Sequence, residues 1–144
     1  MEFLNLGKIQ LHCLSTGQYL TCSRLKKVEL EQVFSTLMAQ KRVRDVTIET
    51  SDLAVLSDDI LTQSLVKMRF LELSSTNLTS RQLTALFHLL KDSTEMEEIV
   101  LTRNILSHVP AEDLARSLSR LKKVKLEYSY LTSEQCIQIF KMGN

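Results

Sequence analysis

The chain has 144 residues, of which 44% are hydrophobic and 24% charged, and its formal net charge is +1. This length and composition predict a single domain with a hydrophobic core of its own. The near-neutral charge argues against nucleic-acid binding, which requires a basic surface opposite the phosphates. No apolar run approaches the ~18 residues of a membrane-spanning helix, and the N-terminus lacks the pattern of a signal peptide.

The cysteines and histidines show no pattern of a reactive site. The three cysteines, an odd number without metal-ligand spacing, are typical of reduced thiols in the cytoplasm rather than of a disulfide framework. A metal site, a catalytic triad or an activated thiolate needs partners at suitable spacing, and the sequence offers none. We therefore expect a cytoplasmic protein without enzymatic activity, metal or cofactor. The residues concerned are Cys13, Cys22, Cys136, His12, His88 and His108.

A fixed spacing of apolar residues recurs along the chain. In the clearest copy, Leu71, Leu73 and Leu78 lie three, five and ten residues after Met68. Complete or partial copies begin near residues 6, 25, 43, 68, 96 and 121, at spacings of 19, 18, 25, 28 and 25 residues. Six copies of L-x-x-L-x-L at such spacings are the signature of a leucine-rich-repeat solenoid.

The first two units are the most irregular. Their spacings are shorter than the range of about 20–29 residues that is usual for this repeat class, so we expect a strand followed by a tight turn or a single helical turn. Their apolar residues are Leu6, Ile9 and Leu11 in the first unit and Leu25, Val28 and Leu30 in the second.

Each later unit is predicted to contain a short strand and then a helix. In DVTI, FLEL, EIVL and KVKL apolar and polar residues alternate, which predicts strands with one buried face. The segments 79–82 and 132–135 read TSRQ and TSEQ, and both match the capping box that begins a helix. Apolar residues four apart, such as Leu86 and Leu90, then mark a buried helix face.

The residue eight positions into each unit holds the turn after the strand. Leucine-rich repeats commonly have Asn or Cys at this position, where the side chain bonds the backbone of the turn. Asn104 alone supplies it here, while Ser51, Thr76 and Ser129 can make part of the same bonds through a hydroxyl.

These units resemble the ribonuclease-inhibitor type of leucine-rich repeat. Segments such as LKKVKLEYSYLTSEQCIQIF and MRFLELSSTNLTSRQLTALFHLL also resemble the C-terminal repeats of NOD-like receptors, over roughly residues 25–142. The resemblance implies a single α/β domain over residues 1–144, a curved solenoid of about six repeats with a parallel concave sheet and outer helices. It also implies a protein-protein interaction module that senses ligand or maintains autoinhibition in a cytosolic innate-immune receptor.

The same repeat class suggests an alternative role, the regulation of an enzyme. GTPase-activating proteins for Ran carry this repeat and use an exposed arginine on a repeat loop. Arg103, next to Asn104, is the residue of this chain that such a function would use. We expect Arg103 instead to be a residue at the rim of a binding surface or an ordinary solvated charge.

The predicted concave face is the candidate binding site, because positions 2, 4 and 6 of each unit point away from the core. Acidic residues gather in its middle, apolar residues lie beside them, and lysines and a tyrosine mark its C-terminal end. Aromatic anchors among charges are typical of protein interfaces, although an ordinary solvated sheet face would carry similar residues. The candidates are Glu29, Asp45, Glu49, Phe70, Glu72, Glu98, Val100, Arg103, Lys123, Lys125 and Tyr128.

The two ends of the repeat array give a further expectation. A solenoid exposes a layer of core at each end unless polar terminal repeats cover it. The last unit here ends at residues 140–144, and the first begins almost at Met1. We therefore expect self-association through an uncapped end, or a longer native protein of which this chain is a fragment.

Overall fold

The computed structural model describes residues 7–15 and 17–142, except for the side chain of Leu14. These residues form an α/β fold. The strands are β1 (Ile9–Leu14), β2 (Gly17–Ser23), β3 (Val43–Glu49), β4 (Phe70–Ser74), β5 (Glu98–Thr102) and β6 (Lys123–Glu127). The helices are α1 (Lys27–Ala39), α2 (Asp58–Leu65), α3 (Ser80–Leu90), α4 (Ala111–Ser119) and α5 (Ser133–Met142), with a short 3-10 helix, η1 (Leu53–Val55). The predicted α/β class is confirmed.

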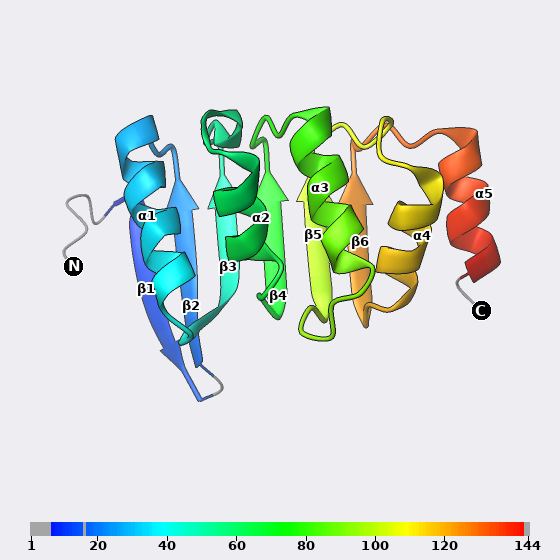
Figure 1. Cartoon of the computed structure of the whole chain (residues 1–144). Coiled ribbons are helices and arrows are strands. Elements are labelled where there is room, and N and C mark those ends of the chain that lie inside the picture. The colour runs from blue at the N-terminus through cyan, green and yellow to red at the C-terminus, as the bar shows by residue number, and fades with distance from the viewer. Residues whose placement is uncertain (1–6, 16, 143–144) are drawn as a thin grey trace.

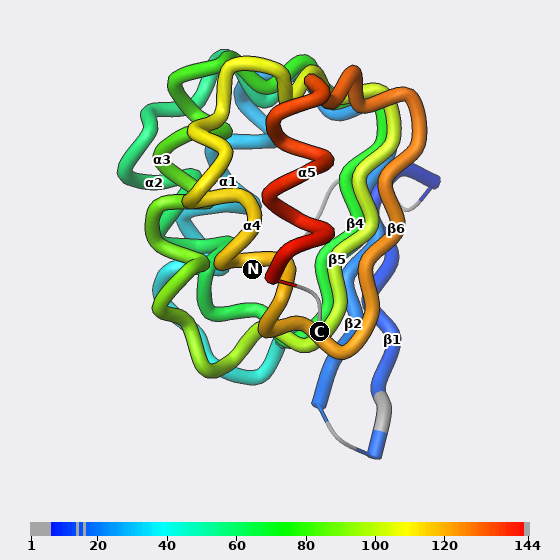
Figure 2. The backbone as a smooth tube through the Cα atoms, turned by 90° about the vertical axis from the view of Figure 1, so that its right-hand side faces the viewer, coloured from blue at the N-terminus to red at the C-terminus, as the bar shows by residue number. Residues whose placement is uncertain are grey.

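The strands form one six-stranded sheet in the order of the chain, β1 to β6. β1 and β2 are an antiparallel hairpin, and every later pair is parallel. Parallel neighbours require a crossover connection, and here each crossover carries a helix. Figures 1 and 2 show that the helices lie on one side of the sheet, so the other side is open.

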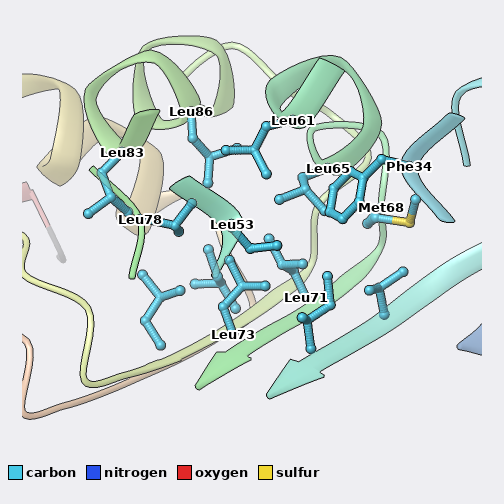
Figure 3. Close-up of a cluster of buried hydrophobic side chains, with 14 of the residues drawn as sticks. Phe34, Leu53, Leu61, Leu65, Met68, Leu71, Leu73, Leu78, Leu83 and Leu86 are labelled. Atoms are coloured by element: carbon cyan, nitrogen blue, oxygen red, sulfur yellow. The ribbon is translucent and has the colours of Figure 1, made fainter. Parts of the chain in front are cut away.

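The core lies between the sheet and the helix layer. Leu73 on β4 is fully buried and pairs with Leu101 on one side and Ile48 on the other, as predicted from the repeat. Figure 3 shows Leu71 and Leu73 directed toward leucines of α2 and α3. Alternation along each strand therefore places positions 3 and 5 of the repeat in the core.

The turns after the strands are held by a repeated set of bonds. The residue that follows each of β3 to β6 has a left-handed backbone, at Thr50, Ser75, Arg103 and Tyr128. Asn104 is buried, and its side-chain amide donates to the carbonyl oxygens of Leu73 at 3.0 Å and Thr102 at 3.2 Å. The predicted role of Asn104 in the turn is confirmed.

Both predicted capping boxes are present, and each has a second role. Gln82 accepts from the backbone N–H of Thr79 at 3.0 Å and begins α3. Its Nε2 also donates to the carbonyl oxygens of Leu53 and Leu56, both at 3.0 Å, in the turn of the preceding unit. Gln135 makes the equivalent bonds at α5. One buried amide therefore caps a helix and ties it to its neighbour.

The predicted second strand, beginning at Leu25, is wrong. Residues 27–39 form α1, whose buried residues Leu30, Val33, Phe34 and Leu37 have helical spacing. The strand of this unit is β2 instead, which begins at Gly17 and aligns in parallel with β3. With that start, the repeating units begin at residues 17, 43, 68, 96 and 121, with no short spacing among them.

The predicted first unit is also wrong as a parallel repeat. Ile9 and Leu11 lie on β1, but β1 runs antiparallel to β2, and Leu6 lies outside the described residues. Gly17 allows the hairpin, because it has φ +140° and a side chain there would approach the carbonyl oxygen of Arg42 to 3.0 Å. The repeating register therefore begins with β2, and β1 is added at the edge.

No helix within the described ranges has the length and apolar character needed to cross a membrane.

Candidate functional site

The side of the sheet opposite the helices, called here the open face, bears three rows of side chains that run across the strands. The strands are in register, so equivalent positions lie side by side. The first row contains His12, Tyr19, Asp45, Phe70, Glu98 and Lys123, the second Gln10, Thr21, Thr47, Glu72, Val100 and Lys125, and the third Ser23, Glu49, Ser74, Thr102 and Glu127.

The structure brings together on this face the candidates predicted on the four later strands. They are Asp45, Glu49, Phe70, Glu72, Glu98, Val100, Lys123 and Lys125. Arg103 and Tyr128 lie in the turns directly after β5 and β6, at the edge of the face. That these residues bind a partner stays a prediction.

The expected position of Glu29 on the concave face is wrong, because Glu29 belongs to the first turn of α1. Its carboxylate accepts from the backbone N–H of Lys26 at 2.9 Å and from the Lys8 Nζ at 3.1 Å. The hydrogen bond from Lys26 and the pairing with Lys8 lower the pKa of Glu29. Glu29 therefore stabilises the start of a helix rather than contributing to the open face.

Two aromatic side chains of the first row are in contact with each other. Tyr19 on β2 and Phe70 on β4 meet edge to face, with ring centroids 6.1 Å apart and planes at 81°. The hydroxyl of Tyr19 is 2.6 Å from the Oγ1 of Thr47, and the ring of His12 lies 5.6 Å from that of Tyr19. Hydrogen bonding and ring packing therefore hold Tyr19 in place, so that Phe70 meets a fixed aromatic neighbour.

An ion pair between Asp45 and Arg69 lies next to these rings. Asp45 lies between Tyr19 and Phe70 in the strand register, and Arg69 bonds both of its carboxylate oxygens, at 3.2 and 2.7 Å. A two-point bond of this kind fixes both groups and satisfies both charges. The surrounding hollow has a volume of about 420 Å³ and is lined by Tyr19, Asp45, Arg69, Phe70, Glu97 and Glu98.

Sequence reasoning missed Tyr19, because it missed β2. The segment GQYLTCS has alternating burial, with Leu20 and Cys22 facing the core. It lacks a large apolar residue at the first position of the repeat, and a cysteine occupies the place of a leucine. A search for period-two alternation next to the S-T-G turn signal would have found this strand.

Three carboxylates form a diagonal on the open face. Glu49, Glu72 and Glu98 lie on neighbouring strands, each displaced by two residues from the next. None of them has an ion-pair partner within 4.0 Å among residues 7–15 and 17–142. Desolvation, followed by repulsion from Glu49 and a smaller effect of Glu98, raises the pKa of Glu72, while Lys125 opposes the change. The middle of the face is therefore acidic and incompletely neutralised.

The C-terminal rim is aromatic and basic. The guanidinium of Arg103 lies 5.6 Å above the ring centroid of Tyr128, a cation–π arrangement. Tyr128 and Tyr130 are both 67% exposed. Arg103 is thus held against a tyrosine at the edge of the face.

The other candidate reactive groups are dispersed. His12 is on β1, His88 on α3 and His108 in the loop before α4. Cys22 is buried, and desolvation raises its pKa to about 12, whereas Cys13 and Cys136 are exposed. Across the described chain, no group of three or more His, Cys, Asp or Glu residues is arranged to hold a metal ion.

Comparison with known proteins gives no relative: no protein-family model, no curated protein and no solved structure matches this chain.

Proposed function

We propose that the chain is a leucine-rich-repeat solenoid of the ribonuclease-inhibitor type. Three features support this proposal: the sequential parallel strands, the single helix layer and the register that repeats every 25–28 residues from Gly17. The left-handed residue after each of β3 to β6 and the buried Asn104 in the turn after β5 also fit this repeat type. Nearest-neighbour packing of equivalent units then accounts for the fold.

We further propose that the protein is a cytoplasmic interaction module whose open face binds another protein. The observation that carries this proposal is the Tyr19–Phe70 pair, two half-exposed rings beside Glu72 and Glu98, which have no ion-pair partner within 4.0 Å in the described part of the chain. Aromatic side chains bordered by charges are the usual anchors of interfaces. A role in ligand sensing or autoinhibition, as in the repeats of NOD-like receptors, is the form of this function that the sequence resemblance favours.

The proposal is tested by comparing a variant of the open face with a variant of the helix side. Wild-type protein, the double variant Phe70→Ala/Glu72→Lys and the control Arg81→Gln are immobilised and exposed to cytosolic extract. Arg81 is 87% exposed on α3, on the helix side, so its substitution leaves the open face unchanged. Proteins that bind to wild type and to Arg81→Gln but not to the double variant are candidate partners.

A direct affinity measurement with a purified candidate then decides the matter. Phe70→Ala is expected to weaken the free energy of binding by about 1–2 kcal/mol or more and to leave the melting temperature unchanged. This is the behaviour of an anchor that contributes to binding but not to folding. Equal affinity of wild type and double variant, combined with weaker binding of Arg81→Gln, would move the binding site to the helix layer.

A further inference from the structure

The acidic diagonal of the open face has a regular geometry. Glu72 is aligned with Thr47 and Val100, Glu49 lies two residues beyond Thr47, and Glu98 lies two residues before Val100. With about 4.8 Å between strands and about 6.6 Å along two residues, successive carboxyl-bearing positions are about 8 Å apart. The three carboxylates therefore form an evenly spaced line across β3, β4 and β5.

The protein neutralises most other acidic groups around this line but not the line itself. Asp45 is bonded by Arg69, Glu97 by Lys122 at 3.0 Å, and Glu127 by Lys125 at 3.1 Å. Lys123 is aligned with Glu98 on β6 without forming an ion pair with it in the described residues, and Lys125 acts on Glu72 only over a longer distance. Cations from a partner would remove the repulsion that the free protein retains.

Apolar groups border the same line. Val100 is beside Glu72 on β5, Phe70 precedes it on β4, and both are half-buried. The alkyl stem of a basic side chain packs on such groups while its cation reaches a carboxylate, and a guanidinium also stacks on an aromatic ring. The chain itself contains this arrangement, since Arg103 lies over Tyr128.

We propose that the open face binds an extended segment of a partner protein in which arginine or lysine recurs at every second residue. Its cations lie over Glu49, Glu72 and Glu98, and their stems pack on Phe70 and Val100. Side chains on one face of an extended strand repeat every ~6.6 Å, and flexible basic side chains span the difference from the ~8 Å diagonal. The inference rests on the proposed role of the open face and adds the chemical class of the partner.

The experiment uses the full chain and two synthetic peptides that differ only in charge. One carries arginine at three alternate positions of an extended, threonine-rich sequence, and the other carries citrulline, the neutral isostere, at the same positions. Affinities are measured by fluorescence anisotropy at low and high salt, and the contact surface is mapped by NMR chemical shifts. We expect the arginine peptide to bind at least about tenfold more tightly, with an advantage that falls as salt screens the charges.

Two matched variants locate the effect. Glu72→Gln removes one charge from the middle of the diagonal, and Glu31→Gln removes one from the exposed surface of α1. Glu72→Gln is expected to weaken arginine-peptide binding several-fold, and Glu31→Gln to leave it unchanged. Melting curves of both variants confirm that each remains folded.

The outcomes separate this inference from the proposed function. Equal binding of the two peptides, or no binding of the arginine peptide, overturns the preference for a basic segment. The open face then remains a binding surface if Phe70→Ala still weakens a protein partner. If the arginine peptide shifts residues of the helix layer and Glu31→Gln weakens it as much as Glu72→Gln does, both proposals fail.

Discussion

The two ends of the sheet differ in how completely they cover the core. Leu20 on β2 and Val124 on β6 occupy the same position of the repeat, yet Leu20 is 3% exposed and Val124 is 36% exposed. β2 has β1 on its outer side and α1 above it, whereas β6 has no further strand among the described residues. Figure 1 shows β1 and α1 at one end and α5 at the other.

The difference shows that a repeating unit does not bury its own apolar face. The same residue positions are buried when a layer lies on both sides and exposed when a layer lies on one. At the C-terminal end an apolar hollow of about 370 Å³ remains, and Phe140 is 83% exposed. At the other end Ile9 is buried, while Leu11 is 48% exposed. Among the described residues, the C-terminal end therefore exposes more of its apolar layer than the hairpin end does.

The largest expected effect comes from shortening equivalent leucines in the middle and at the end. Leu73→Ala should lower the free energy of unfolding by about 2–5 kcal/mol, because Leu73 is fully buried between two strands. Leu126→Ala, at the same position on β6, should lower it by about 1 kcal/mol or less, since Leu126 is only partly buried. Urea denaturation measures both values, and equal losses would contradict the dependence on neighbouring layers.

The buried glutamines give a second comparison. Gln82→Ala should destabilise the protein by about 1–3 kcal/mol, because it removes the buried side-chain donor to the carbonyl oxygens of Leu53 and Leu56. Gln135→Ala removes the equivalent bonds at α5, which packs against α4 at the C-terminal end of the helix layer. We expect it to increase hydrogen exchange in α5 and to change global unfolding little. A similar loss of global stability in both variants would show that the end helix is fully coupled to the core.

Self-association should depend on one end of the molecule. Sedimentation at increasing concentration is expected to show association of wild-type protein, weakened by Phe140→Glu at the exposed apolar end. Leu11→Glu, at the hairpin end, is the matched control and should associate like wild type. A wild-type protein that stays monomeric at high concentration would rule out this contact.

The smallest expected effect is the pH dependence of the acidic diagonal. Because the folded protein raises the pKa of Glu72, the charged carboxylate is unfavourable in the folded state and protonation relieves it. Glu72→Gln should therefore stabilise the protein slightly near neutral pH, by less than about 1 kcal/mol since the site is partly solvated. This advantage should disappear as the pH falls through the raised pKa. Melting temperatures of both proteins across the acid range measure it, and a destabilised variant at neutral pH would contradict the sign.

Much of the fold follows from local sequence pattern. The alternation in FLEL and EIVL predicted strands β4 and β5, and the capping boxes predicted the starts of α3 and α5. The asparagine at position 104 predicted the turn that follows β5. These features depend on residues a few positions apart, whose backbone geometry and hydrogen bonds are fixed locally. For the same reason the open-face positions of β3 to β6 could be read from the sequence.

Only the tertiary structure decided which segments of the N-terminal third form strands and which form a helix. It also decided the contact between Tyr19 and Phe70 in the site. Leu25, Val28 and Leu30 fit the strand template, but Leu30 also begins a helical spacing that continues through Val33 and Leu37. Pairing of β2 with β3 settles the choice, because it supplies the strand of this unit and leaves residues 27–39 to cover it as a helix. The contact of Tyr19 with Phe70 likewise depends on two strand pairings, which bring together residues far apart in the chain and which no local pattern contains.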